Sequence, residues 1–187
     1  SIRDDNPVMF VEHRMLHAHR GHAPAEAYTV PFGQARVLVK GSDVTLVGIS
    51  YAAVECLRAQ RYLDDVGISA EVIDPVSLSP LDMDTIVASV NKTGRLLVVD
   101  SAWTMCGASA EILAQVAERL QGSPHIRWQR MGFAPVVCPT TRNLENLFYP
   151  NAQTVASAAF ALVHDNRKSW APLHEEAPEI VEFKGPF

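Results

Sequence analysis

The sequence predicts a three-layer α/β/α domain with a mostly parallel sheet of about five strands, preceded by an amino-terminal arm. Two observations support this fold class. Runs of nearly continuous apolar residues, such as Val44–Ile49 and Leu96–Val99, are typical of strands buried on both faces. Between such runs lie segments of about ten to sixteen residues with apolar side chains at helical spacing, and this alternation is the pattern of βαβ units.

The amino-terminal part begins with a predicted strand at Val8–Val11, followed by a polar connector over Glu12–Tyr28. Gly21 and Pro24 interrupt this connector, so no long helix is expected there. Regular structure then begins with a strand in Ala35–Val39.

The central elements follow a strand, helix, strand, helix order. A helix is expected over Tyr51–Val66, ended by Gly67, and a strand over Glu71–Ile73. Ser79 is expected to cap the next helix, with Pro80 at its first position and its end near Gly94.

The carboxy-terminal half continues the alternation after the strand at Leu96–Val99. Gly107 precedes a helix that ends at Gly122, and Ile126–Trp128 predicts a strand. Asn151 is expected to cap a last helix reaching Val163. From Asn166 onward the chain is polar and contains several prolines, which predicts a tail.

Composition narrows the class of protein. Of 187 residues, 48% are apolar and 20% charged, as in ordinary globular proteins. The net charge of −5 does not indicate the basic surface that binds nucleic acid. No run approaches the ~18 apolar residues of a membrane span, and no signal peptide opens the chain, so we expect a cytoplasmic protein. Because Ser1 is not methionine and a strand follows almost at once, we also expect the chain to be a fragment.

Two groups of residues could bind metal, but neither fits well. Cys56, Cys106 and Cys138 are odd in number and form no CxxC pair, which predicts free thiols rather than a zinc ribbon or disulfide framework. His13 and His17 have helical spacing, with His19 and His22 nearby, but no third ligand follows at a familiar spacing. A solvated connector is the preferred interpretation, and no metal site is expected.

Gly48-Ile49-Ser50-Tyr51-Ala52 resembles the turn that presents a nucleophilic serine in hydrolases. Asp100 and His125 complete the order Ser, Asp, His. However, His125 precedes its strand, so it should lie at the opposite edge of the sheet from Ser50 and Asp100. Ser50 is therefore expected to cap a helix, and a serine hydrolase with Ser50 and Asp100 is only a weak alternative.

Two loops could carry other functions. Met105–Glu111 enters a helix and could bind an anion, although a tight turn without a ligand is the preferred interpretation. The segment from Cys138 to Pro150 mixes proline, aromatic and charged residues. Its Arg142, Glu145, Phe148 and Tyr149 could form a docking surface, and packing against the domain is an equally good interpretation.

Many short runs, in order and at the right spacings from about Asp4 to Val163, resemble the β subunits of pyruvate, branched-chain 2-oxo-acid and acetoin dehydrogenases. The runs that carry this resemblance are Asp5-Asn6-Pro7-Val8, Tyr28-x-Val30-Pro31-x-Gly33, Gly41-Ser42-Asp43-Val44-Thr45, Gly67-Ile68-x-Ala70-Glu71, Pro80-Leu81-Asp82, Lys92-Thr93-Gly94-Arg95-Leu96 and Gly107-Ala108-x-Ala110-Glu111-Ile112.

This resemblance implies the following organisation. Residues 1–30 would hold the last strand of a truncated pyrimidine-binding domain and a linker, residues 31–165 a transketolase C-terminal-like domain, and residues 166–187 a polar tail. The parent enzyme would use thiamine diphosphate and magnesium, bound mainly outside this chain, for oxidative decarboxylation of a 2-oxo acid with acyl transfer to a lipoyl group. No catalytic or cofactor-binding residue is therefore expected here.

The resemblance also implies partners: an α subunit, a second β subunit across a two-fold axis, and the lipoyl acyltransferase core. The chain alone is expected to be inactive and to serve assembly and docking. A stand-alone, non-catalytic interaction module of the same fold is the alternative from another functional class.

Overall fold

The computed structural model describes residues 2–123 and 125–173, and the side chains of Ala18, Arg142 and Asn143 lie outside the described part. The chain divides into two units. One contains Ser1–Tyr28 and the other is Thr29–His174. The first contains a short 3-10 helix, η1 (Arg14–Ala18), and exposed apolar residues at Val8–Val11.

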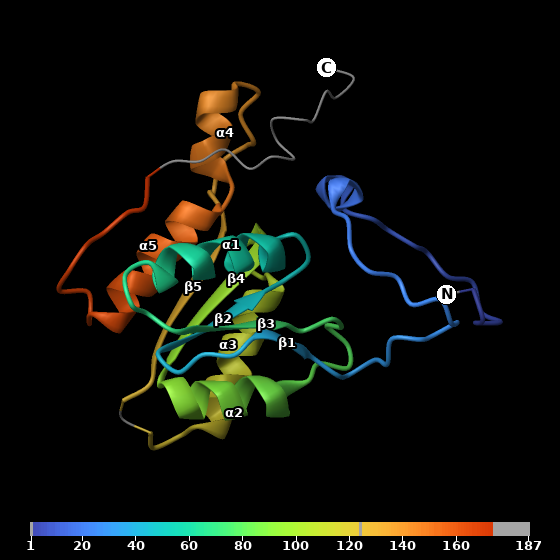
Figure 1. Cartoon of the computed structure of the whole chain (residues 1–187), viewed down its shortest axis with the longest axis horizontal. Coiled ribbons are helices and arrows are strands. Elements are labelled where there is room, and N and C mark those ends of the chain that lie inside the picture. Colours follow the sequence, from blue (N-terminus) through green and yellow to red (C-terminus); the bar gives the residue numbers. More distant parts are fainter. Residues whose placement is uncertain (1, 124, 174–187) are drawn as a thin grey trace. The chain divides into compact units, whose positions relative to one another are not determined.

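The second unit is an α/β domain built on one five-stranded sheet (Figure 1). Its strands are β1 (Arg36–Val39), β2 (Val44–Gly48), β3 (Ala70–Asp74), β4 (Arg95–Trp103) and β5 (Arg127–Phe133), in the spatial order β1-β3-β2-β4-β5. β1 is antiparallel to β3, and every other pair is parallel. The predicted fold class, a mostly parallel sheet of about five strands between two helical layers, is confirmed.

Two hydrophobic cores lie on the two faces of the sheet. α1 (Ala52–Asp64) and α5 (Ala152–Val163) pack against β2 and β4 through fully buried Cys56, Leu63 and Val155. α2 (Met83–Thr93) and α3 (Ala108–Arg119) cover the other face through Ile86, Ile112 and their neighbours (Figure 1). β2 and β4 are buried on both faces, which is why they appear as continuous apolar runs.

Expectations on local structure were wrong at Val8–Val11, at Ser79 and at residues 142–148. Val8–Val11 is not a strand, because nothing in the described residues pairs with its backbone. Ser79 does not cap α2, since the helix begins later and Asp82 accepts the amide hydrogen of Thr85. Residues 142–148, expected as loop, form α4 (Arg142–Phe148).

The observed cap, Asp82, and the expected cap, Ser79, can be compared directly by substitution. Asp82 accepts hydrogen bonds from the amide of Ala35 (2.9 Å), the amide of Thr85 (3.1 Å) and the hydroxyl of Thr85 (2.7 Å). We expect Asp82→Ala to lower the free energy of unfolding by about 1–2 kcal/mol, because two backbone amides lose their acceptor. Ser79→Ala should leave urea unfolding unchanged, and equal losses for the two variants would contradict the assignment of the cap.

Candidate functional site

Ser50 and Asp100 lie at the carboxyl ends of neighbouring strands, whereas His125 lies at the other end of the sheet. The carbonyl oxygen of His125 is 4.0 Å from the position that a Cβ atom on Gly94 would take, just before β4 begins. The expected separation of His125 from Ser50 and Asp100 is therefore confirmed. These three side chains do not form a catalytic triad, because a triad requires direct contact between its members.

Ser50 itself adopts an unusual backbone conformation without capping a helix. Its φ is +59° and its side chain is exposed, but α1 begins after Tyr51 and has no side-chain cap. The expectation that Ser50 caps this helix was wrong, because the first turn is closed by backbone bonds such as that from the amide of Ala53 to the carbonyl of Ser50.

The amino end of α3 is occupied by a carboxylate of the same chain. Asp100 is buried, and its Oδ2 accepts the amide hydrogen of Ser109 at 3.2 Å. Gly107 lets the loop approach β4, since a Cβ atom there would lie 2.3 Å from the carbonyl oxygen of Trp103. A negative group already placed at a helix amino end disfavours a second anion. Met105–Glu111 therefore forms a tight turn, and the helix amino end that it leads to already contacts a carboxylate of the chain.

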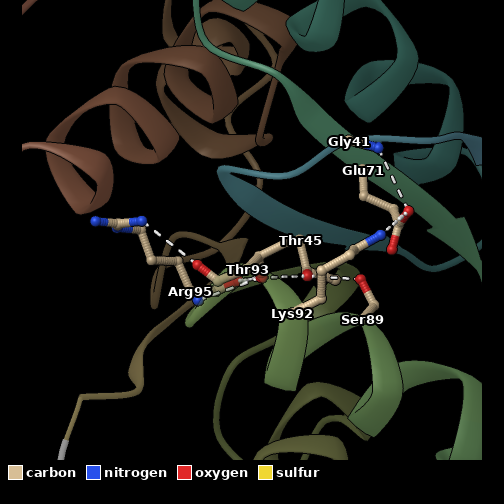
Figure 2. Close-up of polar contacts among 7 residues, drawn as sticks. All are labelled: Gly41, Thr45, Glu71, Ser89, Lys92, Thr93 and Arg95. Atoms are coloured by element: carbon tan, nitrogen blue, oxygen red, sulfur yellow. Dashed lines mark hydrogen bonds and ion pairs between the residues drawn. The ribbon is translucent and has the colours of Figure 1, made fainter.

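A polar cluster lies at the amino end of the sheet, between α2 and the strands (Figure 2). Thr45 on β2 hydrogen-bonds the hydroxyls of Ser89 (2.7 Å) and Thr93 (2.8 Å) on α2. Next to them, Lys92 donates to Glu71 on β3 at 2.6 Å. Figure 2 shows these side chains pointing at one another rather than into a cavity. The cluster therefore fastens α2 to the sheet.

Glu71 is ionised in this cluster because its partners outweigh its burial. Burial alone raises the pKa of the carboxyl group, but hydrogen bonds from Lys92, Ser89 and the amide of Gly41, with the charge of Lys92, hold it below its ordinary value of 4.5. A lowered pKa means that Glu71 stabilises the fold above its unfolded pKa, and that this stabilisation is lost as pH falls through the folded pKa.

We therefore expect Glu71→Gln to flatten the acid limb of the stability profile. The variant should be less stable than the parent at neutral pH, with the difference shrinking below about pH 5. Chemical unfolding at a series of pH values measures this. Glu118→Gln, at an exposed position on α3, is the control and should keep the slope of the parent. A constant difference between Glu71→Gln and the parent at all pH values would contradict the assignment.

The segment from Cys138 to Pro150 carries exposed apolar side chains. On α4, Leu147 is 77% exposed and Leu144 is 50% exposed, while Phe148 is buried and stacks on Phe133 with ring centroids 5.2 Å apart. Phe148 therefore holds the helix in place instead of presenting a docking surface.

The other predicted docking residues are placed differently. Tyr149 is partly exposed, and its hydroxyl lies 3.2 Å from the sulfur of Cys138. That hydrogen bond, burial, and the nearby Cys138 and Glu145 raise the pKa of Tyr149 to about 12. Glu145 is half-buried on α4, and the side chain of Arg142 lies outside the described residues. Sequence reasoning missed Leu144 and Leu147, although their spacing with Phe148 is helical.

The histidines of the first unit do not assemble a metal site in the described part of the chain. His17 lies 3.0 Å from a carboxylate oxygen of Glu12, and burial lowers the pKa of His13. Across the described residues, no three His, Cys, Asp or Glu side chains are placed to hold one metal ion. Nor is any described helix both long and apolar enough to cross a membrane.

Comparison with known proteins points to one family. The profile described as "Transketolase, C-terminal domain" matches residues 33–155. The β subunit of acetoin:2,6-dichlorophenolindophenol oxidoreductase from Cupriavidus necator is 40% identical over 159 residues, which are 85% of this chain and 47% of that protein. The mitochondrial pyruvate dehydrogenase E1 component subunit beta from Dictyostelium discoideum is 36% identical over 171 residues, 89% of this chain and 48% of that protein.

A solved structure supports the same relationship. A split-gene transketolase, described as an inactive beta4 tetramer, superposes with a TM-score of 0.64 at 27% sequence identity, over 73% of this chain and 44% of that chain. The chain spans about half the length of the curated relatives it matches.

Proposed function

The chain belongs to the transketolase C-terminal domain family, and we propose that it is the carboxy-terminal domain of the β subunit of a thiamine-diphosphate-dependent 2-oxo-acid dehydrogenase. The observation that carries this proposal is the 36–40% identity to β subunits of pyruvate and acetoin enzymes over most of the chain. The parent reaction would be oxidative decarboxylation of a 2-oxo acid of the pyruvate type, with acyl transfer to a lipoyl group. The cytoplasmic location expected from the sequence stays a prediction.

The catalytic machinery of the parent is proposed to lie mainly outside this chain. Thiamine diphosphate supplies the carbanion chemistry when bound, and magnesium holds its diphosphate. Two observations on the described residues support this part of the proposal. No set of three carboxylate, thiol or imidazole ligands gathers in the described part. In addition, the carboxylate of Asp100 already occupies the amino end of α3. What the domain contributes is a rigid scaffold and its surfaces.

The partners proposed are an α subunit, a second copy of the β subunit and the lipoyl acyltransferase core. For the core, the supporting observation is the exposed apolar surface of Leu144, Leu147, Val136 and Val137 around α4, with Tyr149 at its side. Exposed apolar groups beside an aromatic residue are typical anchors of protein interfaces.

We expect Leu147→Asp to weaken binding of the acyltransferase core by about tenfold or more, because a charge would be buried in the contact. Since Leu147 is 77% exposed, the fold should be unaffected. Surface plasmon resonance with the immobilised core measures this. Val66→Asp, at a partly exposed position after α1, is the control and should bind as the parent does. Parent-like binding by Leu147→Asp would place the docking surface elsewhere.

The proposal as a whole is tested by binding of the full chain to the α subunit and acyltransferase core from the same organism, followed by native mass spectrometry. We expect a complex that contains both the chain and the α subunit. Binding of neither partner would favour the stand-alone interaction module. Labelling by a fluorophosphonate probe that disappears in Ser50→Ala would instead revive the hydrolase alternative.

A further inference from the structure

An open groove of about 500 Å³ lies between α3 and β5. It is lined by Ala110, Leu113, Ala114, Ala117, Trp128, Gln129 and Arg130. β5 is the last strand of the sheet, and among the described residues no strand lies beyond it. Arg127–Arg130 are all exposed. An unpaired strand edge of this kind is a template for pairing with another strand.

The helix beside this edge leaves room for a close neighbour. Ala110, Ala114 and Ala117 recur at helical spacing on the groove side of α3, and the last two are exposed. Small side chains let a second helix approach to the short end of the usual 8–10 Å interaxial distance. A sheet that continued past β5 could therefore bring another helix next to α3.

The groove face of β5 carries an aromatic and a cationic side chain, which can pair with each other when two copies of the strand meet. Trp128 and Arg130 both point to the α3 side, because they pair with Leu96 and Val98 of β4, whose side chains belong to the core on the α2 and α3 face. Trp128 is 50% exposed, and Arg130 donates to the carbonyl of Thr104 at 2.6 Å, which holds it on this face. An arginine over the face of a tryptophan within about 6 Å is an attractive pair.

We propose that β5 is an interface between two copies of this chain, which pair antiparallel across a two-fold axis at Gln129 and form one continuous sheet. In this arrangement Trp128 of each copy lies opposite Arg130 of the other, and the two α3 helices meet along their alanines. The inference deepens the proposed function by naming the surface of the β–β contact, but it does not require the α subunit.

The choice of register follows from the sequence of β5. A two-fold axis perpendicular to the sheet keeps both α3 helices on one face and must pass through a residue position, because opposite residues have to share a face. An axis at Arg127 or Arg130 places two like charges directly opposite, which is destabilising. An axis at Trp128 stacks the two tryptophans but leaves Arg130 opposite Ile126 of the other copy. Only the axis at Gln129 forms two Trp–Arg pairs.

Cysteine cross-linking tests both the interface and its register. In an otherwise intact chain carrying Cys106→Ser and Cys138→Ser, Gln129→Cys should oxidise to a disulfide-linked dimer of twice 20.5 kDa. Opposite residues of an antiparallel pair have Cα atoms about 4.5–5.5 Å apart, within disulfide range. Arg127→Cys is the matched control. Its two copies would lie about 14 Å apart along the strands, so the chain should stay uncross-linked.

Further variants complete the test in solution. Sedimentation should give a dimer for the parent and a monomer for Arg130→Glu, with unchanged circular dichroism because Arg130 is exposed. A monomeric parent, or equal cross-linking of Gln129→Cys and Arg127→Cys, would overturn the proposal. Cross-linking by Trp128→Cys in place of Gln129→Cys would overturn the register. If Gln129→Cys cross-links but the α subunit does not bind, the interface holds while the proposed function fails.

Discussion

Gly48→Ala is expected to destabilise the domain by about 3 kcal/mol or more, the upper range for overpacking a core. A Cβ atom at this position would lie 2.5 Å from the Cα of Ala53 and 2.6 Å from its amide nitrogen. These are backbone atoms in the first turn of α1, so no side-chain rotation relieves the contact. α1 would have to move away from β2, and it carries the fully buried Cys56 and Leu63.

Chemical unfolding of Gly48→Ala measures this loss, and Gly21→Ala is the matched control. Gly21 has no atom within 4 Å of an added Cβ, so its replacement should leave the unfolding midpoint unchanged. A midpoint for Gly48→Ala within error of the parent would mean that α1 does not pack against the end of β2 as described.

Glu55→Ala is expected to cost about 3 kcal/mol or more, because it breaks a buried ion pair on one side only. The carboxylate is buried between α1 and α5. It accepts the amide hydrogen of Ala152 at 2.7 Å and a hydrogen bond from Arg58, also at 2.7 Å. Alanine leaves the first amide of α5 without the acceptor that Glu55 provides, and it removes the carboxylate to which Arg58 donates.

The conservative variant separates the two contributions of Glu55. Glu55→Gln keeps an oxygen that can accept from Ala152 but loses the negative charge, so its loss of stability should be clearly smaller than that of Glu55→Ala. Urea unfolding of both variants, with unchanged slopes, measures the difference. Equal losses for alanine and glutamine would mean that the ion pair with Arg58, and not the bond to α5, accounts for the effect.

The sheet could be predicted because its central strands bury both faces. Val44–Ile49 and Leu96–Val99 are apolar at every or nearly every position, and this pattern needs no knowledge of the neighbours. Gly94 and Gly122, both at positive φ, likewise marked the ends of their helices. The capping box of Asn151 and Thr154 confirmed the predicted start of α5.

The predictions that were wrong concern features that are set by contacts between distant parts of the chain. Ser79 and Asp82 are both good caps by residue type, and Asp82 was selected because it also accepts the amide of Ala35, far away in sequence. Val8–Val11 has the composition of a strand but finds no partner in the described residues. α4 depends on Phe148 packing against Phe133, a contact that no local pattern discloses.

The candidate sites also divide into those that the sequence pattern predicted and those that only contacts between distant residues reveal. The separation of His125 from Ser50 and Asp100 followed from strand order alone. Glu55 was missed, because a glutamate in the first turn of a helix usually interacts with the helix end and faces water. Only its burial against α5 shows a different role. The groove at β5 also required the structure, since Ile126–Trp128 gave no sign of being an edge.

The central claim is that this chain is part of a thiamine-dependent dehydrogenase, and the most direct test is dye reduction by the native protein. The protein is captured from its source with an antibody against this chain. It is then supplied with thiamine diphosphate, magnesium, an artificial electron acceptor and a panel of 2-oxo acids with acetoin. We predict dye reduction that requires both a 2-oxo acid and thiamine diphosphate. Reduction with acetoin alone would mean that the substrate is acetoin and not a 2-oxo acid. The absence of thiamine-dependent dye reduction with every substrate would contradict the claim.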